Sequence, residues 1–393
     1  MKILVIPSWY PPNGGWFFKE HAMAVAAGGT QVDVIAGIYA SIRKTNPLKW
    51  ISKDRLIIKK EDNIREIIRR YPIIPFSEKL NYHGWVRMML LLYDQYHQKF
   101  GHPDIIQVHS SLWAGVVASQ IHKRYKVPYV ITEHRSRFVG NSVEAHSMFR
   151  PWYTGPLQEA FRGAAAIVSV SPALHEKIIE IYPKAAEKLD VIFNMVDTHF
   201  FTPAQENTIK NRPFRLFSLA YLEPVKGINT LLEALKICND RFPAEFELTI
   251  GGDGSERNYL EKFCQDHRIT NLVRFAGKLN RDQVRQAMQT ADAFVLPSRF
   301  EAFGVVYIEA MACGLPVIAT RAGGPESFVK PGTGILINPN SPEELANAIY
   351  QVRSNYNSYS PAFIRDYAEK NFSRNGIAEK YIALYQKILH HKK

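Results

Sequence analysis

Short apolar runs alternate with helix-length amphipathic segments along almost the whole chain. The runs are rich in Val, Ile, Leu and Phe, and the segments between them carry apolar residues at helical spacing. Alternating β and α elements are typical of a parallel, doubly wound sheet, because successive parallel strands need a crossover connection. The predicted strands are residues 3–7, 32–36, 105–109, 129–132, 166–170, 190–193, 214–220, 246–251, 273–277, 293–297, 316–319 and 334–337. The sequence therefore predicts an α/β fold.

The alternation is interrupted by the polar segment PAQENTIKNRP at 203–213 and then starts again. A chain of 393 residues is also longer than one hydrophobic core usually holds. We therefore expect two Rossmann-like domains of similar size, residues 1–203 and 204–375, that face each other across a cleft. The helix predicted at about 376–393 could pack on either domain, and we expect it to return to the first.

Composition is that of an ordinary globular protein, with 46% hydrophobic and 22% charged residues. Three cysteines, Cys238, Cys264 and Cys313, match neither a disulfide framework nor a zinc site, so we interpret them as packing residues in a reducing compartment. The first apolar run is too short for a signal peptide, and no apolar stretch is long enough to span a bilayer. We expect a cytoplasmic protein.

The formal charge of +12 lies mainly in the first half of the chain, with net +8 for residues 1–205 and +4 for residues 206–393. Its densest part, residues 42–70, holds ten basic and four acidic side chains. Three interpretations compete: a solvated face, contact with an anionic membrane surface, and nucleic-acid binding. No nucleic-acid-binding motif accompanies the charge. We therefore expect no nucleic-acid partner and keep peripheral membrane contact as a hypothesis.

Glycines and charged residues gather where predicted strands end, which is where open parallel sheets bind ligands. Gly14 and Gly15 precede a helical segment whose start could receive a phosphate, and a plain turn is the competing interpretation. The segment GGDG at 251–254 is a second tight turn with the same two interpretations. Lys226, just before Gly227, could neutralise a diphosphate, although any surface loop can hold a lysine.

The segment PSRFEAFGVVYIEAMACG at 297–314 places two glutamates in unusual settings. Glu301 lies in a polar loop, and Glu309 lies in an apolar run, where a buried carboxylate is costly unless something hydrogen-bonds to it. A helix is predicted to begin at Val305 after Gly304, and its first N–H groups could receive a phosphate or a sugar oxygen. The two carboxylates could hold sugar hydroxyls. The competing interpretation is an ordinary loop acid and an ordinary helix acid.

These residues resemble the retaining glycosyltransferases of family 4, which have the GT-B fold. The resemblance spans nearly the whole chain, and its signature is the pair Glu301 and Glu309 with seven residues between them. Supporting motifs are PPNGG near the start, VIFNMVDTHFF at 191–201, LEPVKG, GGDG and AGGPESFV. The order of these motifs makes the resemblance specific.

The resemblance implies a role for each matching residue. Glu301 would bind hydroxyls of the donor sugar and Glu309 the ribose of the nucleotide. Gly15 and Lys226 would bind the diphosphate, and His134 would lie near the reacting sugar carbon. The catalytic candidates are thus His134, Glu301 and Lys226. The donor-binding candidates are Gly14, Gly15, Tyr221, Lys226, Gly252, Gly254, Phe303, Gly304, Val305 and Glu309, and the acceptor-binding candidates are His109, Arg135 and Trp85.

The implied reaction transfers a sugar from a UDP- or GDP-linked donor to a saccharide or lipid-linked saccharide, with retention at the anomeric carbon. The resemblance places it in the biosynthesis of a polysaccharide or surface glycan. A glycosidase also uses two carboxylates, but it has no diphosphate to hold. No Asp-x-Asp segment occurs in the chain, so we expect no metal and no cofactor. Lys226, helix N-termini and backbone amides would then meet the charge of the leaving group.

The chain departs from the family at Tyr221, where the family usually has an arginine that helps the lysine hold the diphosphate. A phenol there would weaken leaving-group stabilisation unless Arg135, Arg137 or Arg299 reaches the diphosphate. We expect an active enzyme. The alternative is a degenerate nucleotide-sugar-binding partner subunit without turnover.

The acceptor is expected on the first domain. The segment at 77–100 has an apolar helix face that includes Trp85, Met88, Met89 and Leu92. Core packing is the ordinary interpretation of such a face, and docking on a membrane that carries a lipid-linked saccharide is the competing one.

Overall fold

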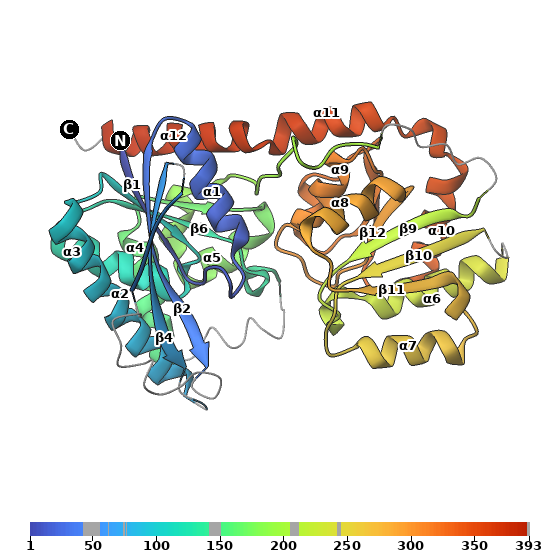
Figure 1. The fold of residues 1–393 in the computed structure, drawn as a ribbon, viewed down its shortest axis with the longest axis horizontal. Coiled ribbons are helices and arrows are strands. Elements are labelled where there is room, and N and C mark those ends of the chain that lie inside the picture. Colours follow the sequence, from blue (N-terminus) through green and yellow to red (C-terminus); the bar gives the residue numbers. More distant parts are fainter. Residues whose placement is uncertain are drawn as a thin grey trace. The chain divides into compact units, whose positions relative to one another are not determined.

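The structure is a computed structural model that describes residues 1–41, 56–61, 63–73, 75, 77–140, 151–204, 212–241 and 245–390. The chain divides into two compact units (Figure 1). Unit 1 comprises Met1–Phe193 and Arg374–Lys393, and unit 2 comprises Asn194–Ser373. The sequence predicts the first boundary after residue 203, whereas the structure places it after Phe193. The reason is that the Val196 N–H donates to the carbonyl of Phe372, which ties this segment to unit 2.

Unit 1 is built on an eight-stranded sheet with the strand order β3-β4-β2-β1-β5-β6-β7-β8. Neighbouring strands run parallel, except that β3 is antiparallel to β4. The central strands β5, β6 and β7 are buried along their whole length, as is typical of parallel strands covered on both faces. The strands are β1 (Lys2–Pro7), β2 (Gln31–Ser41), β3 (Leu56–Glu61), β4 (Ile64–Ile73), β5 (Ile105–His109), β6 (Tyr129–Glu133), β7 (Ala166–Ser169) and β8 (Leu189–Val191).

Helices cover both faces of this sheet. On one face α1 and α12 pack together (Figure 1), and the Tyr381 hydroxyl of α12 lies 3.2 Å from the Thr132 hydroxyl of β6. On the other face α2 packs over Gly37 of β2 and contacts α3, which in turn contacts α4. The last helix therefore belongs to unit 1. The helices are α1 (Trp16–Ala27), α2 (Glu78–Phe100), α3 (Val116–Tyr125), α4 (Pro151–Gly163), α5 (His175–Ile181) and α12 (Arg374–His390).

The apolar face of α2 lies in the core of unit 1. Trp85 and Met89 are fully buried, and Met88 and Leu92 are buried beside them. A Cβ on Gly37 would come within 2.6 Å of the Trp85 ring, so this ring lies directly against the sheet. The membrane-docking interpretation of this face is therefore wrong. Trp85 is a core residue and not an acceptor-binding one.

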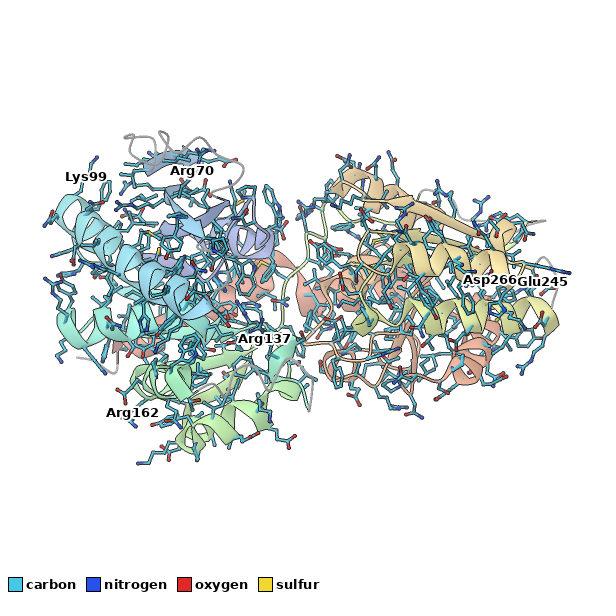
Figure 2. The ribbon with its side chains drawn as sticks, turned by 90° about the horizontal axis from the view of Figure 1, so that it is seen from below. Arg70, Lys99, Arg137, Arg162, Glu245 and Asp266 are labelled. Atoms are coloured by element: carbon cyan, nitrogen blue, oxygen red, sulfur yellow. The ribbon has the colours of Figure 1, made fainter. Side chains whose placement is uncertain are left out.

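The basic run at 42–70 contains two strands that the hydrophobic pattern does not predict. Residues 42–55 and 62 lie outside the described residues, and residues 56–61 and 64–70 belong to the antiparallel pair β3 and β4, with β3 at the edge of the sheet. Lys59 and Lys60 are exposed on the edge strand, and Arg70 is exposed on β4 (Figure 2). Charged side chains on an edge strand disfavour pairing with another chain.

Unit 2 is built on a six-stranded parallel sheet with the order β11-β10-β9-β12-β13-β14. The predicted pair of α/β domains with parallel sheets is thus confirmed. The strands are β9 (Phe214–Leu219), β10 (Phe246–Gly251), β11 (Val273–Gly277), β12 (Ala293–Leu296), β13 (Val317–Thr320) and β14 (Gly334–Ile337). The helices are α6 (Ile228–Arg241), α7 (Arg257–Asp266), α8 (Arg281–Thr290), α9 (Val305–Ala312), α10 (Pro342–Ser354) and α11 (Pro361–Phe372).

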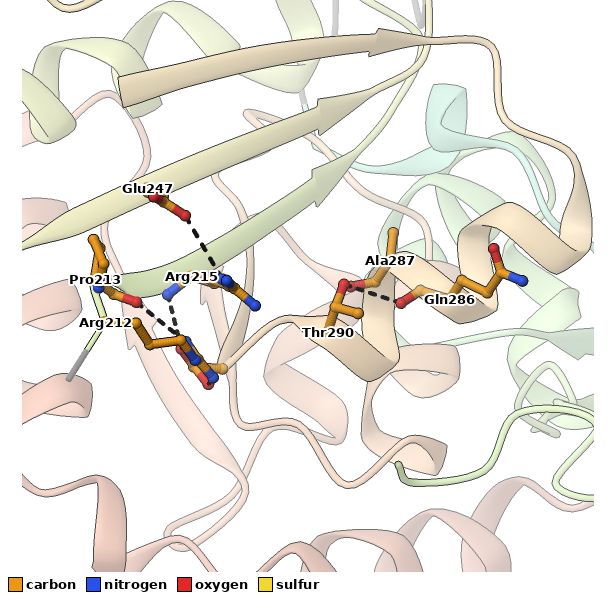
Figure 3. A network of polar contacts seen from close by, with 8 residues as sticks. Arg212, Pro213, Arg215, Glu247, Gln286, Ala287 and Thr290 are labelled. Atoms are coloured by element: carbon orange, nitrogen blue, oxygen red, sulfur yellow. Dashed lines mark hydrogen bonds and ion pairs between the residues drawn. The ribbon is translucent and has the colours of Figure 1, made fainter. Parts of the chain in front are cut away.

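A buried ion pair holds the start of β9. The guanidinium of Arg212, which is labelled in Figure 3, donates two hydrogen bonds, of 2.6 and 2.8 Å, to the fully buried carboxylate of Asp292. The backbone N–H of Arg215 donates to the same carboxylate at 2.8 Å. The hydrogen bond to Asp292 raises the pKa of Arg212. Residues 205–211 of the predicted linker lie outside the described residues, and this pair fixes the chain where β9 begins.

Within the described ranges, no helix is both long and apolar enough to cross a membrane.

Candidate active site

The loop between β12 and α9 is tied to the loop after β13 by backbone hydrogen bonds. The Glu301 N–H donates to the carbonyl of Ala322 (2.9 Å), and the Gly324 N–H donates to the carbonyl of Glu301 (2.8 Å). A Cβ on Gly324 would lie 2.5 Å from the backbone of Phe303, so only glycine allows this close approach. These contacts fix the backbone of Glu301 just after the carboxyl end of a strand, where parallel sheets bind ligands.

The carboxylate of Glu301 forms an ion pair with Lys226, which lies in the turn between β9 and α6. Nζ of Lys226 is 2.7 Å from Oε2 of Glu301, and the Ser298 hydroxyl donates to the same oxygen at 3.4 Å. The two side chains are 23% and 12% exposed, so salt screens this pair less than a surface pair. The structure thus brings together two predicted catalytic residues that lie 75 positions apart in the sequence.

Helix α9 begins at Val305, as predicted, directly after this loop. Gly304 caps the helix with φ +90° and without a side-chain hydrogen bond, so the N–H groups of the first turn can bind an anion. A Cβ on Gly304 would lie 2.5 Å from the ring of Tyr307. That ring is fully buried, and its hydroxyl donates to the carbonyl of Leu296 at 2.5 Å. Glu309, which the sequence places in a buried position, is half-buried on this helix.

Gly252 and Gly254 allow two loops to interlock. Gly252 has φ +117°, and a Cβ there would lie 1.8 Å from the carbonyl oxygen of Ala220. A Cβ on Gly254 would lie 2.5 Å from the carbonyl oxygen of Leu222, whose N–H donates to the carbonyl of Asp253 at 3.1 Å. This packing accounts for both glycines as structural residues. Their assignment to the donor stays a prediction.

Two aromatic candidates of unit 2 lie in opposite environments. The Tyr221 side chain is 75% exposed after the end of β9. Phe303 is buried, and its ring packs against Phe328 and Phe372 with ring-centre distances of 4.9 and 6.1 Å. The prediction that the Phe303 side chain binds the donor is therefore wrong, because the ring belongs to the core.

Arg299 lies next to the turn that carries Lys226. Its backbone N–H donates to the carbonyl of Val225 at 2.8 Å. Within the described part of the chain its side-chain Nε is buried without a hydrogen-bond partner, which is costly for a charged donor. Arg299 is one of the arginines considered to replace the charge missing at Tyr221, and its backbone lies beside this turn.

Unit 1 holds a chain of three histidines. His134 follows β6, His109 ends β5 and His21 lies on α1. Nε2 of His134 is 3.1 Å from Nδ1 of His109, and Nε2 of His109 is 3.3 Å from Nδ1 of His21. Burial lowers the pKa of His21 to about 3 and the pKa of His109 well below 6.5. Both inner rings are therefore neutral at pH 7.

The position of His109 corrects its assignment to the acceptor. His109 is 1% exposed, so its ring is too buried to contact an acceptor. It can act on a ligand only indirectly, by positioning the half-buried His134 to which it is hydrogen-bonded. The rings of Phe17 and Phe18 each lie 5.1 Å from that of His134, and Phe18 stacks on His109 at 4.6 Å. His134 therefore packs against two phenylalanine side chains and the imidazole of His109.

Among the described residues, no three His, Cys, Asp or Glu side chains form a group that could hold a metal ion.

Glu133 fixes the backbone around His134. Its carboxylate is fully buried and accepts hydrogen bonds from the backbone N–H groups of His134 (2.9 Å), Arg135 (3.1 Å) and Ser111 (2.8 Å). The hydroxyls of Ser110 and Ser111 donate to it as well. Five donors compensate the buried charge, and Glu133 thereby positions two candidate residues at once.

Helix α1 begins at Trp16 after two glycines in the left-handed region. Gly14 has φ +87° and Gly15 has φ +76°, and a Cβ on Gly15 would lie 2.8 Å from the carbonyl oxygen of Trp9. Gly15 caps the helix without a side-chain hydrogen bond. The start of α1 can therefore bind an anion in the same way as the start of α9, and the diphosphate role of these glycines stays a prediction.

Sequence reasoning did not single out Glu133, His21 or Phe18. Glu133 follows the apolar strand YVIT, which is the same signal of a costly carboxylate that drew attention to Glu309. Phe18 and His21 are three positions apart on a predicted helix, a spacing that places both on one face. That face could have been recognised, but its contact with His109 depends on how α1 packs on the sheet.

Two family models match consecutive parts of the chain. The model described as Glycosyltransferase Family 4 matches residues 15–200, and the model described as Glycosyl transferases group 1 matches residues 201–370. The second range contains Lys226, Glu301 and Glu309.

Relatives and solved structures are similar over most of the chain. A glycogen synthase of Mycobacterium tuberculosis is 26% identical over 370 residues, which cover 90% of this chain and 86% of that protein. A D-inositol 3-phosphate glycosyltransferase of Paenarthrobacter aurescens is 30% identical over 255 residues, 62% of each chain. The solved structure of sucrose-phosphate synthase from Thermosynechococcus elongatus matches with a TM-score of 0.80 and 23% identity over 100% of both chains. Anabaena HepE in complex with UDP and glucose matches with a TM-score of 0.74 and 22% identity, covering 98% of this chain and 100% of that one.

Proposed function

Because the chain belongs to the group 1 glycosyltransferases of the GT-B fold, we propose that it transfers a hexosyl group from a nucleoside diphosphate sugar to a saccharide, with retention at the anomeric carbon. The observation that carries the proposal is the ion pair of Lys226 and Glu301 beside the start of α9. A cation, a carboxylate and helix N–H groups together suit a diphosphate joined to a ring with many hydroxyls.

The donor is assigned to unit 2, with UDP or GDP as its nucleotide. Lys226 and Glu301 neutralise each other in this structure. A donor that places its diphosphate at Lys226 and a sugar hydroxyl at Glu301 gives the ammonium an anionic acceptor and the carboxylate a hydrogen-bond donor, so the pair suits a ligand with these two ends. Glu309, half-buried on α9, is assigned to the ribose hydroxyls.

In the proposed reaction the bond between the anomeric carbon and the leaving phosphate oxygen breaks. A bond from the acceptor hydroxyl oxygen forms on the same face, and the proton of that hydroxyl passes to the leaving phosphate oxygen. Lys226, Arg299 and the N–H groups of α9 stabilise the charge that develops on the diphosphate without a metal. Glu301, held by Lys226, orients the sugar and does not attack it. His134 is assigned to the reacting sugar, in the orientation that Glu133 and His109 impose.

Release of nucleotide from a panel of UDP-, GDP- and ADP-sugars, with and without a mixture of saccharides, tests this function. We expect slow hydrolysis of one donor by the unaltered protein and a rate at least about 100-fold lower for Glu301→Gln. The control is Glu343→Gln, because this exposed carboxylate pairs with Arg241 on the surface and should leave the rate unchanged. Nucleotide binding without release from any donor would instead identify a binding subunit.

The charge missing at Tyr221 gives a second prediction. If Arg299 supplies it, Arg299→Gln should lower the rate constant for nucleotide release by about 10–100-fold, and adding Tyr221→Arg should restore part of the loss. The exposed Arg274 provides the control, since Arg274→Gln removes an equal charge from β11. Equal rates for Arg299→Gln and Arg274→Gln would contradict this role.

A further inference from the structure

A pocket of about 200 Å³ lies in unit 1 at the carboxyl ends of its strands. Its walls come from β2, from the start of α2, from the turns after β1, β5 and β6, and from α4. The residues that matter here are Tyr39, Trp113, Arg135, Arg137, Trp152 and Tyr153. Sites for drug-sized ligands are usually about 300–1,000 Å³, so this smaller pocket suits a single sugar ring.

Two arginines give the pocket a positive wall. The guanidinium of Arg135 lies over the Trp9 ring at 4.4 Å, and its Nε is buried without a hydrogen-bond partner among the residues that the structure describes. Burial lowers the pKa of Arg135, and the nearby charge of Arg137 (Figure 2) lowers it further, whereas Glu133 raises it. Glu133 is already compensated by five donors, and the wall residue Glu78 is exposed. An anion between the two arginines would satisfy the buried donor and relieve their repulsion.

Aromatic rings form the other walls. Trp113 lies 5.8 Å from Tyr39, and Trp152 lies 5.4 Å from Tyr82, between ring centres. Trp113 has φ +64°, which is rare for a bulky residue, and Ser111, two positions earlier, donates a backbone hydrogen bond to Glu133. The backbone is thus kept in a strained form that places an indole ring in the pocket wall. Flat rings of this kind pack against the C–H face of a sugar ring.

We propose that this pocket binds the acceptor, and that the acceptor is a saccharide whose sugar ring carries a carboxylate or a phosphate. The inference rests on the transferase function proposed above. Arg135 and Arg137 receive the anionic group through paired N–H donors, whose planar fork fits either anion. Trp113 and Tyr39 hold the face of the ring. A neutral sugar of the same shape would offer the Nε of Arg135 only an uncharged oxygen, which accepts a weaker hydrogen bond than a carboxylate or phosphate does.

Calorimetric titration of the full chain with matched sugars tests the assignment. The probes are methyl glycosides of glucose, galactose and mannose, each as the neutral sugar, as its uronate and as its 6-phosphate, which separates the two anions. We expect at least one charged sugar to bind at least tenfold more tightly than its neutral counterpart. Arg135→Gln should remove this preference. Arg162→Gln, which removes an exposed arginine paired with Glu159, should preserve it.

Three results would overturn the proposal. The first is equal affinity for charged and neutral sugars, or no binding of either. The second is competition by inorganic phosphate as strong as that of the sugar phosphates, which would show an anion site without a place for the ring. The third is a loss of UDP or GDP affinity in Arg135→Gln with unchanged sugar binding, which would assign the arginine to the nucleotide. If Arg135→Gln does not fold, Arg137→Gln carries the same comparison.

The acceptor assignment and the transferase function fail in different ways. Nucleotide release from a donor without a charge preference among the sugars would refute only the acceptor assignment. A charge preference without release from any donor would refute the transferase function and leave a pocket that binds anionic sugars.

Discussion

At the scale of single residues, buried neutral histidines couple the stability of unit 1 to pH. The unfolded chain takes up protons on His21 and His109 below about pH 6.5. The folded unit excludes a proton from His21 down to its pKa of about 3, and from His109 well below 6.5, because burial penalises the charged ring. Over this window the unfolded state binds more protons, so stability rises with pH and is lost as the pH falls below 6.5.

We expect the free energy of unfolding of unit 1 to fall by about 2 kcal/mol between pH 6.5 and pH 5.5 from these two histidines together. Urea denaturation at a series of pH values measures it. His21→Gln removes one of the two groups and should roughly halve the fall. His83→Gln changes an exposed histidine and should preserve it. The same fall in both variants would contradict the assignment.

The sequence predicted which residues belong to the candidate site better than it predicted which side chains contact each other. Lys226 and Glu301 were both predicted from their places after strands, but nothing in the sequence shows that their side chains meet across 75 positions. Phe303 was predicted as a donor contact from its place beside Glu301, and Trp85 as an acceptor contact from the apolar helix face at 77–100. Their burial is set by the helices that cover them, which a local pattern does not show.

At the scale of elements, the start of α9 depends on a glycine that no other residue can replace without strain. Gly304→Ala adds a methyl group 2.5 Å from the buried ring of Tyr307. It also carries the cost of a left-handed backbone, about 1–2 kcal/mol. Gly29→Ala is a matched control, because Gly29 has φ +83° and no atom within 4 Å of the added Cβ.

We expect Gly304→Ala to cost about 1–3 kcal/mol more than Gly29→Ala in urea denaturation, because overpacking adds to the backbone term. Gly304→Ala should also raise KM for the donor, because a displaced turn moves Glu301 and the first N–H groups of α9 together. Equal stability and equal KM in the two variants would show that the turn adapts to the methyl group.

The elements themselves were predicted well where burial controls the pattern. Each apolar run from 3–7 to 334–337 overlaps an observed strand, because parallel strands covered on both faces are largely apolar. Strands β3 and β4 were missed because their charges dominate the composition of 42–70. Charged side chains on the edge strand β3 disfavour pairing with other chains, and they also interrupt the apolar run by which a strand is recognised in the sequence.

At the scale of the whole molecule, the chain leaves unit 1 after Phe193 and returns to it at Arg374. The returning helix α12 completes the core of unit 1. Its Tyr385 hydroxyl donates to the buried side-chain oxygen of Gln107 at 2.7 Å, and Arg374 pairs with Glu20 at 2.9 Å. Unit 2, by contrast, is one continuous segment.

Truncation after Ser373 should therefore act on one unit only. We expect amide protection in β5 and β6 to be lost, because the Gln107 and Thr132 side chains lose their partners on α12 and an apolar face is exposed. Protection in β9 and β12 should remain. Hydrogen exchange measured by mass spectrometry reads the two units separately, with truncation after His390 as the control. Unchanged protection in β5 would show that α12 is not part of this core.

The return of α12 also sets an order of events during synthesis. A ribosome makes a chain from its amino terminus, and amino-terminal domains usually finish folding first. Here the first unit to be made is the last to be completed, because residues 374–390 emerge after all of unit 2. Until then the nascent chain carries an uncovered apolar sheet face, which is the kind of surface that chaperones bind. The continuous second unit can reach its native state while the first still waits for its final helix.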